Sequence, residues 1–100
     1  MIPGALSESK KATSEIQDLV DRIKPEVEHK TNTTYSELRA VTYKMQIVAG
    51  VNYFVSVATN NESNEVIFLK IHKPLHGSNN DLALTAYQTG KSATDEITPF

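Results

Sequence analysis

The sequence contains no cysteine, which excludes a disulfide framework, a thiolate metal site and a cysteine nucleophile. Glycine is scarce, with four residues in a chain of 100, and no glycine-rich phosphate loop is present. No apolar run approaches the length that spans a membrane, and the N-terminus lacks the apolar segment of a secretory signal. We therefore expect a cytoplasmic protein that has no membrane partner and no cofactor.

An excess of charge of one sign is also missing. Ten Lys and Arg residues stand against twelve Asp and Glu residues, which gives a formal net charge of −2. Binding to nucleic acid normally requires clustered basic residues, whereas the longest basic run here is Lys10-Lys11. We therefore expect no nucleic-acid partner.

Two of the three histidines, His72 and His76, are four residues apart, a spacing that binds zinc when both lie on one helical turn. Here the first ends a predicted strand and the second lies in the following turn, so we expect no metal site. A small enzyme built on this pair remains one alternative. A metal analysis that finds no bound zinc would remove its main support.

The length and a hydrophobic content of 39% suit a single domain over residues 1–100. Residues 1–12 are mostly small and polar and show no period, which predicts a mobile N-terminal arm. Residues 14–35 follow a helical spacing instead. The apolar stripe of this predicted helix consists of Ile16, Leu19, Val20, Ile23 and Val27.

The predicted helix carries its own start signal. Thr13 or Ser14 can cap its first turn, and Ser14 with Gln17 has the spacing of a capping box. Pro25 falls in the middle, where it removes one backbone hydrogen bond and should bend the helix. A bent helix suits packing against a twisted sheet.

After the helix the hydrophobic period changes to two, which is typical of strands. Strands are predicted over residues 40–47, 51–58, 66–73 and 82–88. In the first, one face should carry Val41, Tyr43, Met45 and Ile47, and in the last, Leu82, Leu84 and Ala86. This pattern predicts an α+β fold in which a four- to five-stranded antiparallel sheet wraps one long bent helix.

The connection between the first two strands reads Gln46-Ile47-Val48-Ala49-Gly50. Hairpin tips are normally polar because they face water, and this one is apolar. Gly50 can adopt the positive φ that closes a short turn. An apolar tip is typical of a probe that enters a cleft, although periodicity alone allows a buried strand end equally well.

The segment Gln46 to Gly50 resembles the Gln-x-Val-x-Gly signature of the cystatin family, and the type 1 cystatins, or stefins, in particular. The resemblance extends over nearly the whole chain. Further matching stretches are Met1-Ile2-Pro3-Gly4, Glu15-Ile16-Gln17, Lys24-Pro25, Lys30-Thr31-Asn32, Ala40-Val41, Tyr43-Lys44, Asn52-Tyr53, Leu84-Thr85, Tyr87-Gln88 and Asp95-Glu96.

The resemblance implies a cystatin-like fold and a tight, reversible, competitive inhibitor of papain-like cysteine proteases, such as cathepsins L, S, H and B, rather than an enzyme. In that family an N-terminal arm and two hairpin loops form a wedge that fills the active-site cleft. Carried over to this chain, the arm is Ile2, Pro3 and Gly4. The first loop is Gln46, Ile47, Val48, Ala49 and Gly50, and the second is Pro74, Leu75, His76 and Gly77.

The same resemblance implies a role for each part of the wedge. Ile2 and Pro3 would take non-primed subsites, and Gly4 would turn the chain away from the catalytic sulfur. Val48 and Leu75 would cover the primed side. No cofactor is implied.

The chain departs from the family pattern at two positions. Ala5 stands where many stefins have a second glycine, which stiffens the arm. His76 stands where a member of the family has proline, so the second loop loses a fixed φ and gains chain entropy.

Two alternatives concern the same fold. A non-inhibitory interaction protein could use a cystatin-like fold for another partner, and it would not compete with a protease substrate. Stefins are also known to swap domains by opening the first hairpin. A dimer of that kind would straighten residues 46–50 and should not inhibit, so we expect the active form to be a monomer.

Overall fold

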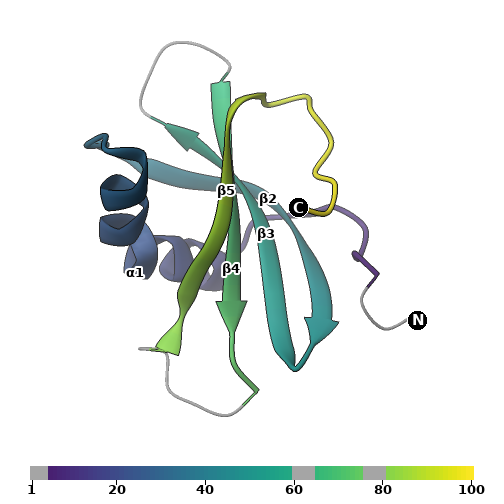
Figure 1. Ribbon diagram of the computed structural model, residues 1–100. Coiled ribbons are helices and arrows are strands. Elements are labelled where there is room, and N and C mark those ends of the chain that lie inside the picture. Colours follow the sequence, from purple (N-terminus) through teal and green to yellow (C-terminus); the bar gives the residue numbers. More distant parts are fainter. Residues whose placement is uncertain (1–4, 60–64, 76–80) are drawn as a thin grey trace.

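One helix packs against a five-stranded antiparallel sheet in the computed structural model, which describes residues 5–59, 65–75 and 81–100 (Figure 1). The strands lie in the order β1-β2-β3-β4-β5. The predicted α+β class is therefore confirmed. The elements are β1 (Lys10–Lys11), α1 (Ser14–Thr31), β2 (Leu38–Val48), β3 (Gly50–Thr59), β4 (Glu65–Lys73) and β5 (Ala83–Ser92).

Helix α1 begins where the sequence predicts, and Thr13 is its N-cap. The Thr13 hydroxyl accepts a hydrogen bond from the backbone N–H of Ile16 at 3.3 Å. The capping box predicted for Ser14 and Gln17 is wrong, because Gln17 binds strand β2 instead. Its side-chain nitrogen donates to the Leu38 carbonyl at 2.9 Å, and its oxygen accepts from the next inward-facing residue of the strand. These bonds fix the first turns of the helix on β2.

The helix ends at Thr31, four residues before the predicted end. Asn32 adopts the left-handed conformation, with φ 52° and ψ 40°, and the N–H of Thr33 donates to the Glu28 carbonyl at 3.1 Å. Asparagine tolerates this conformation and terminates helices with it. Pro25, the residue expected to bend the helix, lies within it.

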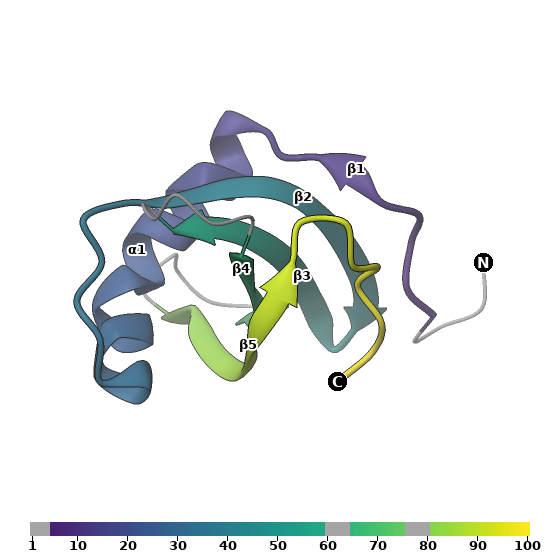
Figure 2. The same cartoon turned by 90° about the horizontal axis from the view of Figure 1, so that it is seen from above.

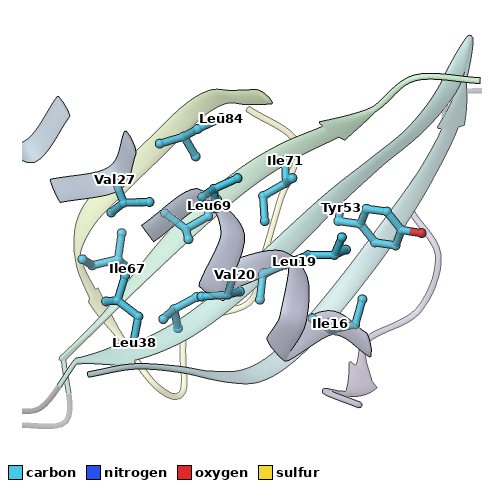
Figure 3. Packing of buried hydrophobic residues seen from close by; sticks show 13 residues of the cluster. Ile16, Leu19, Val20, Val27, Leu38, Tyr53, Ile67, Leu69, Ile71 and Leu84 are labelled. Carbon is cyan, nitrogen blue, oxygen red and sulfur yellow. The ribbon is translucent and has the colours of Figure 1, made fainter. Parts of the chain in front are cut away.

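The inner face of the sheet and the apolar stripe of α1 enclose the main core (Figure 3). All five stripe residues predicted from the sequence are buried. Removing a branched aliphatic side chain of this kind from water contributes about 1.5–3 kcal/mol. The sheet supplies the other buried members of the core, which are Leu38, Tyr53, Val55, Val57, Ile67, Leu69, Ile71 and Leu84.

A β-bulge in β2 alters the predicted inward face of that strand. Ala40 pairs with β3 and so does Thr42, whereas Val41 between them is skipped in the register. Ala40, Tyr43 and Met45 therefore pack against the core, and the placement of Val41 with them is wrong.

A second irregularity changes β5. Leu84 pairs with Ile71, but Ala86 pairs with Lys70, so one residue of β5 is skipped. Side chains directly opposite in an antiparallel pair lie on the same face of the sheet. Ala86 therefore lies on the outer face with Lys70, and its predicted place beside Leu82 and Leu84 is wrong.

The N-terminal segment runs along the edge of β2, with β1 pairing to that strand. Nearer the N-terminus, the Ser7 N–H donates to the Met45 carbonyl at 2.8 Å, and Leu6 forms an isolated bridge with Gln46. Part of the segment predicted as a mobile arm, residues 1–12, is thus bonded to β2, through Leu6, Ser7, Lys10, Lys11 and Ala12. Residues 1–4 lie outside the described part of the chain.

The C-terminal segment covers part of the outer face of the sheet, and Figure 2 shows it on the side away from α1. Phe54, Val66, Phe68 and Ile97 form a second buried cluster there. Leu6 and Phe100 pack against this cluster. The sheet is thus covered on both faces, which the sequence did not predict.

Candidate functional site

The hairpin between β2 and β3 projects from the lower edge of the sheet in Figure 1. Its turn is tight, because Val48 pairs directly with Gly50. Gly50 has a φ of +103°, a conformation that side chains disfavour. Ile47 is 43% exposed and Val48 41% exposed, and Ala49 is also exposed. The apolar tip is therefore presented to solvent, and the alternative of a buried strand end is wrong.

The second predicted loop begins at the same edge, directly after β4. Leu75 is 71% exposed, the largest value among the exposed large hydrophobic residues in the described part of the chain. Its neighbour Pro74 contacts the first hairpin, since a β-carbon added to Gly50 would lie 3.0 Å from the Pro74 carbonyl carbon. The other two residues predicted for this loop, His76 and Gly77, lie outside the described residues.

A hollow of about 310 Å³ is lined by the first tip and by residues 73–75. Its walls include Ile47, Val48, Tyr53, Pro74 and Leu75. Tyr53 is 8% exposed, and burial raises the pKa of its hydroxyl, with smaller contributions from Glu15 and Tyr43. Lys73 also lines the hollow, whose wall is otherwise mostly apolar. The Tyr53 hydroxyl is neutral at physiological pH.

A row of polar side chains crosses the sheet directly above the tip. Asn52 donates from Nδ2 to Gln46 Oε1 at 2.8 Å, and its Oδ1 lies 2.8 Å from His72 Nδ1. Because a carbonyl oxygen only accepts, the proton of that second bond is on His72. The row joins β2, β3 and β4, and it includes Gln46, the first residue of the predicted loop.

The sequence pattern indicates no role for Asn52, and it points to His72 only as a potential zinc ligand. In the structure His72 is a hydrogen-bond partner of Asn52, while His76 lies outside the described residues. Within residues 5–59, 65–75 and 81–100, no group of three or more potential ligand side chains is placed to hold a metal ion. The strand register could have revealed the contact between Gln46 and Asn52. A hairpin that pairs Val48 with Gly50 also places Gln46 opposite Asn52.

The described part of the N-terminal segment reaches the sheet at the first loop. Leu6 bridges Gln46, so the segment runs beside the first residue of the predicted loop. Ile2, Pro3 and Gly4, which the sequence assigns to the wedge, lie outside the described residues. Among the described residues, the structure therefore brings Pro74 and Leu75 beside the first hairpin tip, and Leu6 beside Gln46.

The apolar character of this edge sets it apart from the rest of the described surface. Four large hydrophobic side chains are exposed in that part of the chain: Ile47, Val48, Leu75 and Tyr87. The first three line the hollow at one edge of the sheet, and Tyr87 lies on β5, where its hydroxyl donates to the Lys30 carbonyl at the end of α1. Such a cluster is typical of a protein-binding surface.

The one helix described, α1, is too polar to be a candidate membrane span.

Comparison with known proteins matches a cystatin-domain family model to residues 4–94. The chain is 53% identical over 100 residues to Cystatin-A of Homo sapiens and 49% identical over 100 residues to Cystatin-A of Felis catus, with all of each chain covered. It is also 37% identical over 100 residues to a Sus scrofa protein named leukocyte cysteine proteinase inhibitor 1, covering 95% of that relative.

Proposed function

Because this chain belongs to the cystatin family, we propose that it is a tight, reversible, competitive inhibitor of papain-like cysteine proteases. One of its relatives is named as a cysteine proteinase inhibitor, which supports this class of target. The observation that carries the proposal is the clustering of Ile47, Val48 and Leu75, three of the four exposed large hydrophobic residues of the described chain, at one edge. The chain acts by occupying a cleft and is not itself an enzyme.

The two hairpin tips supply a large part of the affinity of the proposed complex. A nanomolar complex requires about −12 kcal/mol. Burying Ile47, Val48 and Leu75 in a matching cleft contributes roughly 1.5–3 kcal/mol for each side chain. The sheet holds the first hairpin before binding through the pairing of β2 with β3, so little ordering entropy opposes its insertion.

The N-terminal arm makes a different contribution. Ile2 and Pro3 occupy the non-primed subsites of the protease, and Gly4 turns the chain away from the catalytic sulfur before a peptide bond reaches it. Fixing the backbone of each arm residue on binding costs about 1–2 kcal/mol. The value of the arm therefore depends on how well a given protease holds Ile2 and Pro3.

The proposed partners are cathepsins L, S, H and B. The proposed active form is a cytoplasmic monomer that needs no cofactor. His76 and Gly77 belong to the proposed second contact segment with Pro74 and Leu75, of which Leu75 covers the primed side. In a domain-swapped dimer the first tip would be straightened, so inhibition belongs to the monomer.

A titration against papain tests the proposal. Wild-type monomer should abolish hydrolysis of a fluorogenic substrate, and excess substrate should restore it. Leu75→Ser should weaken inhibition roughly tenfold or more, because it removes an apolar contact of the tip. Tyr87→Ser, which removes the exposed apolar residue distant from this edge, serves as the matched control and should leave the inhibition constant unchanged. Full papain activity in a saturating excess of folded wild-type monomer would overturn the proposal.

A further inference from the structure

The two ends of the described chain meet the same apolar cluster on the outer face of the sheet. Leu6 from the N-terminal segment and Phe100 from the C-terminal segment both pack against the cluster that contains Phe54 and Ile97. We propose that the C-terminal segment, residues 96–100, positions the N-terminal segment by completing the apolar surface on which Leu6 packs. This surface, the seat of Leu6, consists of Phe54, Val66, Phe68, Ile97 and Phe100. This inference deepens the proposed function and rests on it only where protease binding is concerned.

Lys44 fastens the C-terminal segment to β2. Its Nζ donates to the Ile97 carbonyl at 2.8 Å and lies 3.3 Å from Glu96 Oε1. Lys44 is only 8% exposed, and a buried ammonium group is retained only where hydrogen-bond acceptors replace its water. The Ile97 carbonyl is such an acceptor, so the segment has a defined attachment point.

Phe100 provides the second attachment of the C-terminal segment, through its contact with Phe54. Its ring meets the ring of Phe54 edge to face, with centroids 5.2 Å apart and an interplanar angle of 84°. Phe54 is 1% exposed and stands directly opposite Lys44 in the register of β2 and β3. The aromatic contact and the Lys44 hydrogen bond thus hold the same segment over the same part of the sheet.

The N-terminal segment has few other attachments at this point. Ser7 donates its N–H to the Met45 carbonyl at 2.8 Å, and its hydroxyl accepts from the Met45 N–H at 2.9 Å. Leu6 adds the bridge to Gln46 and the packing on the outer cluster. Because a short edge segment gains little from hydrogen bonds exposed to water, the packing of Leu6 decides how firmly it is held.

The consequence concerns the wedge. The segment passes Gln46 at the first loop, so the seat of Leu6 fixes where the arm begins relative to that loop. Loosening the C-terminal segment should then weaken protease binding through the arm, while the two hairpin tips keep their structure.

Amide hydrogen exchange on the free protein tests the positioning without any protease. Phe100→Ala should speed exchange of the Ser7 and Met45 amides roughly tenfold, as Leu6→Ala should, because both variants remove packing from one seat. Exchange of the Val55 amide in the inner core should be unaffected beyond any change in global stability. Phe100→Leu, which keeps an apolar side chain, should restore much of the protection and remains informative if Phe100→Ala is poorly folded. Unchanged Ser7 protection in both Phe100 variants would overturn the inference.

A double-mutant cycle against papain then tests the link to binding. Leu6→Ala and Phe100→Ala should each raise the dissociation constant roughly tenfold, and the double variant should be little worse than either. Additive losses would mean that Phe100 acts independently of Leu6, which would overturn the link. If wild-type protein does not bind papain, the proposed function fails, and the exchange experiment still decides the positioning by itself.

Discussion

Gly50 lies so close to the backbone of Lys73 on the neighbouring strand that a β-carbon on Gly50 would overlap the Lys73 carbonyl oxygen. The same β-carbon would come within 2.8 Å of the backbone nitrogen of Leu75. The absence of a side chain at Gly50 therefore allows β4 and the start of the second loop to pass close to the first hairpin. Gly50 has two roles, since its φ of +103° also closes the turn. The two tips consequently depend on one another for their placement.

Gly50→Ala tests this double role, with Gly90→Ala as the matched control. Gly90 also has a positive φ, +70°, but a β-carbon there would meet nothing within 4 Å. Both variants incur backbone strain of about 1–2 kcal/mol, and only Gly50→Ala also displaces residues 73–75. We expect a folded protein in each case by circular dichroism. Papain inhibition should weaken at least tenfold for Gly50→Ala alone.

Equal inhibition constants for the two glycine variants would contradict the role of the close approach. A loss of folding in Gly50→Ala would be detected by urea unfolding before inhibition is measured. The comparison therefore separates strain in the turn from displacement of the second tip.

The fold could be predicted closely because most of its signals are local. The period of two places the second strand at residues 51–58, against Gly50–Thr59 in the structure. Even the helix end has a local signal that sequence analysis did not use, since Asn32 is a residue that readily takes the left-handed conformation.

The errors concern contacts between distant residues. The bulge at Val41 cannot be read from β2 by itself, because a bulge is a property of the pairing with β3. The outer cluster was missed for a similar reason. Ile97 and Phe100 are too few to show a period, and their burial depends on Phe54, more than forty positions earlier in the sequence.

The candidate site likewise has a part that could be predicted from local sequence and a part that depends on contacts between distant residues. Its apolar tip, Ile47 to Ala49, could be recognised because a hairpin tip is a local feature. The row formed by Gln46, Asn52 and His72 required the register of three strands, and the seat of Leu6 required both ends of the chain.

Asn52 holds the side chain of Gln46 at the base of the first tip. Asn52→Ala removes the bond to Gln46 Oε1 and the bond to His72 Nδ1. We expect a loss of about 1–3 kcal/mol in unfolding free energy and weaker papain inhibition, because Gln46 is no longer oriented. Ser56→Ala, a buried polar position on the same face of β3, serves as the control and should leave inhibition unchanged. Inhibition by Asn52→Ala equal to wild type would show that the row is structural only.

Tyr53 makes stability depend on alkaline pH. Burial raises the pKa of its hydroxyl above the ordinary value of 10.0, with added effects of Glu15 and Tyr43. Above pH 10 the unfolded chain therefore loses the Tyr53 proton while the folded protein retains it. The unfolded state then binds fewer protons, so the free energy of unfolding falls as pH rises, by at most about 1.4 kcal/mol per pH unit from this group. The full contribution is present below pH 10.

Urea unfolding of wild type and Tyr53→Phe at about pH 8 and about pH 11 isolates this effect. Other groups titrate equally in both proteins, so the difference between them reports on Tyr53. Wild type should lose more stability than Tyr53→Phe on going to the higher pH. Parallel losses would show that the Tyr53 hydroxyl ionises as readily in the folded protein as in the unfolded chain.

Lys44 has two acceptors in the C-terminal segment, and their contributions can be separated. Glu96 is 80% exposed, so its ion pair with Lys44 is screened by water and contributes at most about 1 kcal/mol. The Ile97 carbonyl accepts from the same Nζ at 2.8 Å, at a position where Lys44 itself is buried. A buried acceptor that loses its donor costs about 1–3 kcal/mol. The bond to Ile97 should therefore dominate.

Lys44→Met keeps the length of the side chain and removes the donor, whereas Glu96→Gln removes only the charge of the exposed partner. We expect Lys44→Met to release the C-terminal segment and to lower the free energy of unfolding by about 1–3 kcal/mol. Carboxypeptidase should then remove Phe100 faster from this variant, because proteolysis requires a free chain end. Glu96→Gln should retain wild-type stability and a slow rate of cleavage. Since an apolar replacement also relieves the cost of burying an ammonium group, unchanged stability together with unchanged cleavage in Lys44→Met would show that the packing of Ile97 and Phe100 holds the segment without the hydrogen bond.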